Sequence, residues 1–393
     1  MNDLFRTGAW HVTLLATCAG GVFLASTVGC DSTSNPVLDR TEDVRNVSTG
    51  DSKSTQLLVD DFVLPTLPVV EPIESAFSLM TWNLEWFWDD ETRDNFSDLS
   101  IEQSAPSRND WNWKRDSVAA AIAHVRPTVV ATQEVEGQRT LWYLTRALER
   151  NHSLRYDEFL IKGDDHFTEQ DVGLLVTEPA SVMATMRGHM TEPMRASDQF
   201  GSVSKHLITR MTIPVGDQEE TIFVVNVHLR ARPEREDLRV KQVKSLNAWI
   251  DQLVVPKING IPVHLVVMGD FNTEHPVGNV GADTELGLAI SRGTSEPDDD
   301  LVDLHQFIDE ANRRTHLLDG RQYDRILVSK SLIEDDPDTA DLVLSSVRVA
   351  DELAVRGSRD TELEHWDNGY WNHDVNERDV SDHYPVLAHF QIQ

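Results

Sequence analysis

The sequence predicts an α/β fold with one large core, and three observations support this prediction. Apolar segments typical of buried strands alternate with segments whose apolar residues recur at helical spacing. About 318 residues, 76–393, follow an N-terminal leader and a polar segment, which is ample for a single core. No repeat recurs at a fixed period, which argues against a solenoid.

The first 30 residues predict an export signal. The apolar run from Val12 to Val28 is interrupted by small and polar residues, so it is short and impure for a membrane-spanning helix. It ends at Gly29-Cys30 in a stretch that resembles a bacterial lipobox, although Thr27 stands where leucine is usual. We expect a signal peptide of the lipoprotein type over 1–30, with Cys30 lipidated; a simple cleaved signal and an uncleaved anchor are the alternatives.

Residues 31–75 predict a disordered, solvated tether. They are rich in Ser, Thr, Asp and Pro and show no sustained periodicity. The only cysteines, Cys18 and Cys30, lie in or at the edge of the leader, so the domain over 76–393 has no internal disulfide and no zinc-thiolate site. We expect an exported protein of the cell envelope, either lipid-anchored to a membrane or periplasmic or extracellular.

The net charge of the chain is strongly negative. The whole sequence carries −31, and about −25 of this charge falls on residues 76–393. Such acidity does not favour a polyanion-binding protein. It does not exclude one, because a bound cation can supply positive charge locally.

The first elements of the domain are predicted from alternation and capping. Phe77–Leu84 alternates enough to form a strand. Asp89–Asn109 is acidic and aperiodic, which predicts a surface insertion. Asp110 is expected to cap a helix over Trp111–Val125, whose apolar residues recur at helical spacing.

The rest of the domain continues this alternation. Two more helices are expected around leucines 141–148 and over 243–253, where apolar residues form one face. Further strands are predicted where short apolar runs meet a polar residue. They are Thr128–Glu134, Val172–Val176, Lys205–Pro214, Ile222–His228, Val263–Met268, Tyr323–Ser329 and Ser381–Ala388.

One strand end stands out as a candidate for chemistry. The apolar run before Gly269 delivers Asp270 and Asn272 into a turn, on the same side of the chain if the extended geometry persists. A carboxylate and an amide at the end of a strand suit metal and phosphate chemistry. An Asx turn that only closes the strand is the alternative.

Residues able to bind a metal or a phosphate recur at the strand ends. They are Asn83, Glu134, His228, Asp270, Asn272, Asp324, Asp382 and His383. Carboxylate and amide oxygens suit a hard cation such as Mg2+, whereas zinc would bring more His or Cys. The set indicates metal-assisted attack on a phosphorus centre.

Six short motifs carry a family resemblance. In chain order they resemble the successive motifs of the endonuclease/exonuclease/phosphatase family, which includes DNase I-like nucleases. They are Thr81-Trp82-Asn83-Leu84, Gln133-Glu134, Asn226-Val227-His228-Leu229, Gly269-Asp270-Phe271-Asn272, Tyr323-Asp324-Arg325-Ile326 and Ser381-Asp382-His383-Tyr384-Pro385-Val386. The resemblance implies a four-layer α/β sandwich, two mixed β-sheets packed face to face with helices outside, and an active site at one edge.

The same resemblance implies the metal ligands. Glu134 matches the principal metal-binding glutamate, and Asn83 and Asp382 are expected to complete or border that site. Asn83 is also able to orient a phosphate oxygen. The implied cofactor is Mg2+, with Mn2+ or Ca2+ as alternatives, and one or two ions remain open.

Catalytic roles are implied for five residues. Asp270 and Asn272 match the pair that positions the attacking water and the scissile phosphate. His383, oriented by Asp324, resembles the imidazole that acts as a base or stabilises the transition state, and His228 resembles a second imidazole near the leaving oxygen. Which imidazole moves the proton stays open.

Four further residues are weaker candidates. Asp171 is expected to orient His228, with an exposed acid at a strand entrance as the alternative. Arg230 and Arg232 are candidates for binding substrate phosphate, whereas the basic residues that follow them suit a solvated helix face. Arg210 resembles a family arginine at the edge of the site.

We expect a metal-dependent phosphodiesterase, a nuclease acting on DNA or RNA. The alternatives are a sphingomyelinase-like enzyme or an inositol-phosphate phosphatase of the same fold, and a non-catalytic surface protein that only binds. The expected partners are nucleic acid as substrate and a membrane through the lipid anchor. No protein partner is inferred, and a monomer is expected.

Overall fold

The computed structural model describes residues 75–253, 263–356 and 369–393, which all belong to one compact unit, Val59–Gln393. The predicted signal peptide, Cys30 and all but the last residue of the predicted tether lie outside the described residues. Among the helices that are described, none combines the length and the apolar character needed to cross a bilayer.

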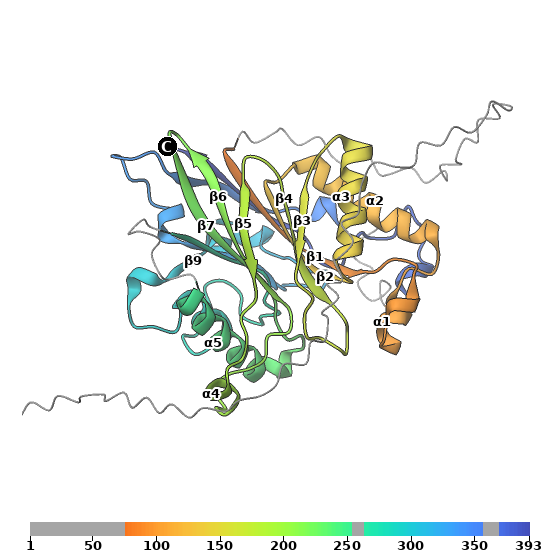
Figure 1. Ribbon diagram of the computed structural model, residues 1–393, viewed down its shortest axis with the longest axis horizontal. Helices are drawn as coiled ribbons and strands as arrows, with labels where there is room; N and C mark the ends of the chain where they lie inside the picture. Colours follow the sequence, from red (N-terminus) through yellow and green to blue (C-terminus); the bar gives the residue numbers. More distant parts are fainter. Residues whose placement is uncertain (1–74, 254–262, 357–368) are drawn as a thin grey trace, which may run out of the picture. The chain divides into compact units, whose positions relative to one another are not determined.

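In the described part of the chain, twelve strands form two mixed sheets of six strands each. Figure 1 shows how these strands are arranged. The first sheet has the order β11-β12-β1-β2-β4-β3. In it only β1 and β2 run parallel, and every other pair is antiparallel. Its strands are β1 (Phe77–Phe87), β2 (Val129–Val135), β3 (Asp157–Leu160), β4 (Asp171–Val176), β11 (Leu342–Val349) and β12 (Val386–Ile392).

The second sheet has the order β5-β6-β7-β8-β10-β9. Here β7 and β8 are the parallel pair, and the other pairs are antiparallel. The strands are β5 (Ser181–Met186), β6 (His206–Val215), β7 (Gln218–His228), β8 (His264–Asp270), β9 (Leu301–Asp303) and β10 (Asp324–Ser329). Each sheet therefore has one parallel pair in its interior, and parallel strands end at the same edge.

Helices cover the outer face of each sheet, so the domain has four layers. One apolar core joins the first sheet to helices α2 (Arg108–Val125) and α3 (Gln138–His152). A second core fills the space between the sheets, and a third joins the second sheet to α5 (Glu236–Leu253) and α6 (Glu285–Ile290). In Figure 1, α2 and α3 lie on one side of the sheets and α5 on the other. The short helices α1 (Asp98–Gln103) and α4 (Glu192–Arg195) lie outside these layers.

This architecture confirms the predicted four-layer sandwich of two mixed sheets flanked by helices. The start of the first helix was predicted wrongly. Ser107 caps α2, because its hydroxyl accepts a hydrogen bond from the Asp110 backbone N–H at 3.2 Å and donates to the Asp110 carboxylate at 2.6 Å. The stretch expected to be an irregular insertion contains α1, which Ser97 caps.

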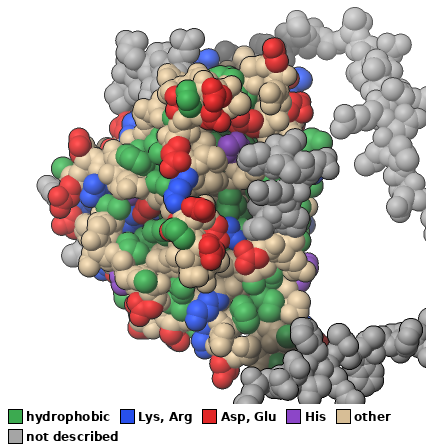
Figure 2. Space-filling model, turned by 90° about the vertical axis from the view of Figure 1, so that its left-hand side faces the viewer, with side chains coloured by type: hydrophobic (Ala, Val, Ile, Leu, Met, Phe, Trp, Pro, Cys, Tyr) green, Lys and Arg blue, Asp and Glu red, His purple; other side chains and the backbone are tan. Residues whose placement is uncertain are grey.

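Charged, hydrophobic and other side chains are mixed over the face seen in Figure 2. Acidic and basic groups are interspersed there, and hydrophobic atoms lie in separate small groups among them. This distribution is typical of a solvated surface.

Candidate active site

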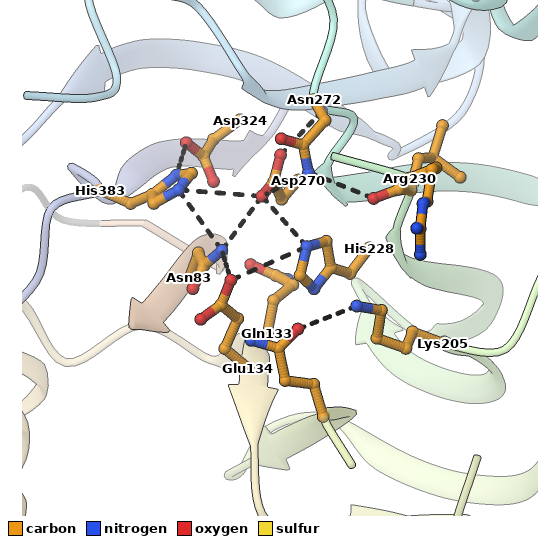
Figure 3. Close-up of polar contacts among 12 residues, drawn as sticks. Asn83, Gln133, Glu134, Lys205, His228, Arg230, Asp270, Asn272, Asp324 and His383 are labelled. Atoms are coloured by element: carbon orange, nitrogen blue, oxygen red, sulfur yellow. Dashed lines mark hydrogen bonds and ion pairs between the residues drawn. The ribbon is translucent and has the colours of Figure 1, made fainter. Parts of the chain in front are cut away.

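The parallel strand pairs bring the predicted residues together at one edge of the sandwich. Asn83 and Glu134 lie at or near the ends of β1 and β2 in the first sheet, and His228 and Asp270 are the last residues of β7 and β8 in the second. His228 pairs with Asp270 in the β7–β8 register. Figure 3 shows side chains from both sheets pointing toward a common centre.

Asp270 occupies that centre. Its carboxylate is 1% exposed and accepts hydrogen bonds from the backbone N–H of Asn272 at 2.7 Å and from the side-chain amides of Asn272 and Asn83 at 3.1 and 3.0 Å. The Nε2 atoms of His228 and His383 lie 3.5 and 3.8 Å from its Oδ2 atom. Burial raises the pKa of Asp270, and the positive charge of His383 acts against that shift. A carboxylate with a raised pKa is a stronger proton acceptor than an ordinary aspartate.

Asn83 links the carboxylates of the two sheets. Its Nδ2 atom donates to Glu134 at 3.2 Å and to Asp270 at 3.0 Å, and it lies 3.4 Å from Nε2 of His383. Its Oδ1 atom accepts the backbone N–H of Glu85 at 3.0 Å. Both N–H groups of the Asn83 amide therefore donate to carboxylates, and its oxygen accepts one backbone N–H. Asn83 thus faces the acidic group with its N–H groups and not with its oxygen.

His383 is oriented by Asp324. The Nδ1 atom lies 2.8 Å from Asp324 Oδ2, which leaves Nε2 facing Asp270 and Asn83. Burial alone would lower the pKa of His383, but the carboxylates of Asp324, Asp382 and Asp270 outweigh it and hold the pKa well above its usual range. His383 is therefore an imidazolium at neutral pH.

His228 lies on the other side of Asp270, and its surroundings favour the neutral imidazole. Burial, together with the positive charges of Lys205 and His383, lowers the pKa of His228 well below its usual value. The predicted orientation by Asp171 does not appear among the contacts of either residue. Asp171 instead pairs with Lys162 at 2.9 Å and accepts the backbone N–H of Gly163. His228 is positioned by its backbone, because its N–H donates to the Lys205 carbonyl at 3.1 Å.

Glu134 is the best candidate to hold a cation. Its Oε1 accepts from Asn83, and its Oε2 accepts the backbone N–H of Trp86 at 3.1 Å. Burial, and next the charge of Asp382, raise the pKa of Glu134 to about 7. Burial disfavours the ionised form of these carboxylates. A divalent ion fits this donor set, because its charge would stabilise the ionised form.

Asp382 lies beside a histidine that the sequence analysis missed. His316, Asp382 and His383 present ligand atoms within 4.8 Å of one another. The Nδ1 atom of His316 accepts the backbone N–H of Leu318 at 2.9 Å, so in the neutral ring the proton is on Nε2, which faces Asp382 Oδ2 at 3.5 Å. In this tautomer Nε2 has no lone pair for a metal. The His316 ring instead packs edge-on against the ring of His383, with the two centroids 4.6 Å apart.

Buried amides form the floor beneath the site. Gln133 donates from Nε2 to Asn226 Oδ1 at 2.7 Å, and Asn226 donates to the carbonyls of Thr132 and Gly173 at 3.1 and 2.8 Å. Both amides appeared in the sequence motifs without a role. Their contact joins the two sheets, because Gln133 lies in β2 one residue before Glu134 and Asn226 lies in β7 two residues before His228. Figure 3 shows Gln133 beside Glu134.

Lys205 adds a positive charge that the sequence analysis did not predict. Lys205 directly precedes β6, and its side chain is 12% exposed (Figure 3). Its ammonium group donates to Gln170 at 2.9 Å. Its charge acts on both Glu134 and His228. Lys205 therefore moderates the negative potential at the edge of the site.

The backbone at the site adopts conformations that are unfavourable for most residues. Glu85, Trp86, Glu134 and Asn272 all have φ between 46° and 56°. Gly269 has φ of 139°, and a Cβ atom there would lie 2.0 Å from the Val227 carbonyl oxygen. Such strain concentrates at sites where side chains must be presented in a fixed direction.

The predicted arginines have different positions. Arg230 and Arg232 are exposed in the segment directly after His228, and Figure 3 shows Arg230 beside the site. Arg210 pairs with Phe223 in the middle of β6, about five residues or roughly 16 Å along the strand from the end of β7. Its strand face is the one that packs toward α5, so Arg210 does not lie at the edge of the site.

Taken together, the fold and this site define a hydrolase that acts on phosphate esters. The sequence profile described as the endonuclease/exonuclease/phosphatase family matches residues 80–383. The chain belongs to this family, as its motifs predicted, and enzymes of the family generally depend on a divalent metal ion.

Comparison with solved structures gives the same fold at low sequence identity. A mannosyl-6-phosphatase from Bacteroides thetaiotaomicron is similar with a TM-score of 0.51 and 16% identity, over 80% of this chain and 99% of that one. A family protein from Bacteroides vulgatus has a TM-score of 0.47 and 16% identity, over 81% and 99% of the two chains. TDP2 from D. rerio, complexed with a single-strand DNA product, has a TM-score of 0.45 and 14% identity, over 80% and 98%. A search of curated proteins found no match.

Proposed function

We propose that this protein is a divalent-metal-dependent phosphodiesterase that hydrolyses DNA or RNA. The observation that carries the proposal is the placement of two imidazoles, one charged and one neutral, on opposite sides of Asp270. Hydrolysis of a phosphodiester needs positive charge at the phosphoryl oxygens, a proton acceptor for water and a group at the leaving oxygen. The geometry around Asp270 supplies a candidate for each task.

Asp270 and Asn272 are the groups that would hold the water. The backbone N–H and the side-chain Nδ2 of Asn272 both donate to the Asp270 carboxylate. The Nδ2 atom also donates to the Leu229 carbonyl at 3.2 Å. This fixes the carboxylate in one orientation. In the proposed reaction the oxygen of water attacks phosphorus, its proton passes to Asp270, and the bond between phosphorus and the leaving oxygen breaks.

The two histidines divide the remaining work. The raised pKa of His383 favours a fixed positive charge at a phosphoryl oxygen, with Asp324 holding the ring. The neutral ring of His228, whose Nε2 lies 3.5 Å from Asp270 Oδ2, would accept the water proton from Asp270 and pass it to the leaving oxygen, so that this proton ends on the alcohol product. A divalent cation held by Glu134 would supply further positive charge to the phosphate and would compensate the acidity of the site.

A nucleic-acid substrate is favoured by the basic groups beside His228. Figure 3 shows Arg230 and Lys205 on the His228 side of the centre. Lys205 is also paired with Asp165 at 3.3 Å, and Arg232 is exposed two residues after Arg230, whereas the chain as a whole carries −31. Local positive charge on an acidic protein is consistent with a bound polyanion. The structural relatives include a phosphatase and a protein bound to single-strand DNA product, and their low identity leaves the substrate to experiment.

A substrate panel tests the proposal. Purified protein would be incubated with plasmid DNA, single-stranded RNA, sphingomyelin, inositol phosphates and mannose 6-phosphate, with and without Mg2+. We expect cleavage of a nucleic acid only with the cation, and loss of it in Asp270→Asn. Hydrolysis of a phosphomonoester or of sphingomyelin alone would assign the site to the other substrate class, and no hydrolysis of any substrate would favour a binding protein.

We further propose that the protein is exported and lipid-anchored through Cys30, and that the domain is monomeric. The lipobox-like end of the leader supports the anchor. Radiolabelled palmitate incorporated in a bacterial host should appear in the wild-type chain and be absent from Cys30→Ser. Equal labelling of the two would exclude Cys30 as the anchor.

A further inference from the structure

A second cluster of metal-ligating side chains lies beside the site. Glu236 at the start of α5, His275 in the loop after β8 and Glu285 at the start of α6 present ligand atoms within 4.8 Å of one another. Nε2 of His275 lies 4.0 Å from Glu285 Oε2 and 3.1 Å from Glu236 Oε1, and this second contact is a hydrogen bond in which the ring donates. A metal ion would displace this proton, whereas the Nδ1 atom of His316 is held as an acceptor by a backbone N–H that keeps the proton of that ring on Nε2. None of the three belongs to the motifs that define the family.

The carboxylate of Glu285 points to a missing ligand. The residue is fully buried, and its Oε1 accepts a hydrogen bond from Arg239 Nε at 3.1 Å. Its Oε2, which faces His275, has no hydrogen-bond partner among the described residues, and 4.0 Å is too long for a hydrogen bond to the imidazole. A buried carboxylate oxygen without a partner is unfavourable unless something else occupies the space in front of it.

The distances suit a metal ion. Ligands bound tetrahedrally to an ion at about 2.1 Å lie roughly 3.4 Å from one another, and the 3.1 and 4.0 Å separations at His275 bracket this value. Arg239 fixes the Glu285 carboxylate from behind, as outer hydrogen-bond partners of metal ligands commonly do. The Glu236 side chain is 43% exposed, so the cluster is open to solvent on that side.

We propose that Glu236, His275 and Glu285 form a second divalent-metal site, separate from the acidic centre at Glu134, that takes a transition-metal ion such as Zn2+. One imidazole with two carboxylates suits zinc, whereas Mg2+ and Ca2+ prefer oxygen ligands alone. Water from the exposed side would complete the coordination.

The position of this site gives the ion a structural task. His275 follows Asn272 by three residues, and Arg239, which holds Glu285, also donates to the carbonyls of Arg230 and Arg232 at 3.2 and 2.8 Å. A bound ion would therefore tie the starts of α5 and α6 to the turn that carries Asn272 and to the segment after His228. The proposal does not depend on the substrate or on catalysis.

Metal stoichiometry tests the proposal directly. The full chain would be stripped of metal, dialysed against Zn2+ and measured by elemental analysis in a Glu134→Gln background, which weakens the other acidic centre. We expect His275→Ala and Glu236→Gln, each added to that background, to lose one equivalent of bound zinc. The same variants should lose the visible absorption of bound Co2+ and the rise in melting temperature that Zn2+ gives the parent.

His264→Ala is the matched control. His264 makes a comparable pair with one carboxylate, 2.9 Å from Glu220 Oε2, and among the described residues its other ring nitrogen contacts Ser331 Oγ rather than a second carboxylate. It should keep the zinc content of the parent. Equal zinc content in the parent, His275→Ala and Glu236→Gln would overturn the proposal, and if His275→Ala fails to fold, Glu236→Gln at the exposed edge decides the question.

Discussion

Asp324 at the start of β10 and His383 just before β12 are joined by a 2.8 Å contact that connects the second sheet to the first. The chain separates the two residues by 59 positions, and both are buried. The contact is reinforced on the His383 side, where the Trp82 indole donates to the His383 carbonyl at 3.0 Å and Ser381 Oγ accepts the His383 N–H at 3.0 Å.

Replacing Asp324 by asparagine should therefore affect both the rate and its pH dependence. The negative charge raises the pKa of His383, so Asp324→Asn lowers that pKa and the imidazolium is lost at lower pH. We expect kcat to fall about 10²- to 10⁴-fold, with the decline at rising pH moved toward acid. The measurement is kcat against pH on the substrate that the panel identifies. Glu220→Gln, which removes the carboxylate paired with the distant His264, should leave the profile in place.

Glu134 makes the stability of the metal-free protein depend on pH. Its pKa is raised from 4.5 to about 7, so the folded state binds this proton more tightly than the unfolded state. The free energy of unfolding should therefore fall as pH rises from about 4.5 to about 7, by at most roughly 3 kcal/mol, and by less because 15% of the side chain is exposed.

Glu134→Gln should remove this dependence. In urea unfolding without metal at pH 8, the variant should be more stable than the wild type, whereas added Mg2+ should stabilise only the wild type. A variant less stable than the wild type at pH 8 without metal would contradict the assigned pKa shift.

Gly269 should not tolerate a side chain. Alanine there combines a φ of 139° with a Cβ 2.0 Å from the Val227 carbonyl oxygen, so the backbone must move and Asp270 must move with it. We expect Gly269→Ala to reduce activity at least about 10²-fold, because small displacements of reacting groups have effects of this size. Gly320→Ala is the control, since Gly320 also has positive φ, 68°, but has open space at its Cβ. Similar activity in the two variants would exclude a steric role for Gly269.

Arg230 and Arg232 should contribute to substrate binding if the substrate is a nucleic acid. Each arginine that contacts a phosphate adds to the salt dependence of binding, so the double variant Arg230→Ala, Arg232→Ala should reduce the slope of log affinity against log salt by about 1 to 2. KM should rise while kcat changes little. Arg235→Ala provides an exposed arginine on the same segment that should leave both values unchanged, and an identical effect of Arg235→Ala would show a general charge effect.

The interior strands of the fold were predictable because strands that are buried on both faces have continuous apolar sequences. In β7 and β8 the side chains on both faces pack against apolar neighbours, and the resulting apolar runs were predicted as strands. The strands at the sheet edges are β3, β5, β9 and β11, and all four were missed. They have partly exposed residues, so they lack such an apolar run or are too short to show one. The order of the strands in each sheet and the packing of one sheet on the other cannot be predicted from apolar runs, because both depend on contacts between segments far apart in the sequence.

The same distinction applies to the site. The motif residues Asn83, Glu134, Asp270 and His383 lie at predictable strand ends, and the structure brings them together. His316 could not be predicted in this way, since it lies in an irregular segment and reaches His383 through an isolated bridge between residues far apart in sequence. The proposed Asp171–His228 contact failed because Lys162 pairs with Asp171 instead.

The pairing of the first strand with the last has a consequence for biosynthesis. In the first sheet β1 lies between β2 and β12, with Phe77 opposite Phe390. During synthesis, one edge of β1 has no native partner until β12 has been made. An unpaired strand edge in that interval favours wrong associations. His383 lies three residues before β12 and contacts Asp324 of the second sheet, so the closing of the first sheet and the completion of the His383 side of the site depend on the same late segment.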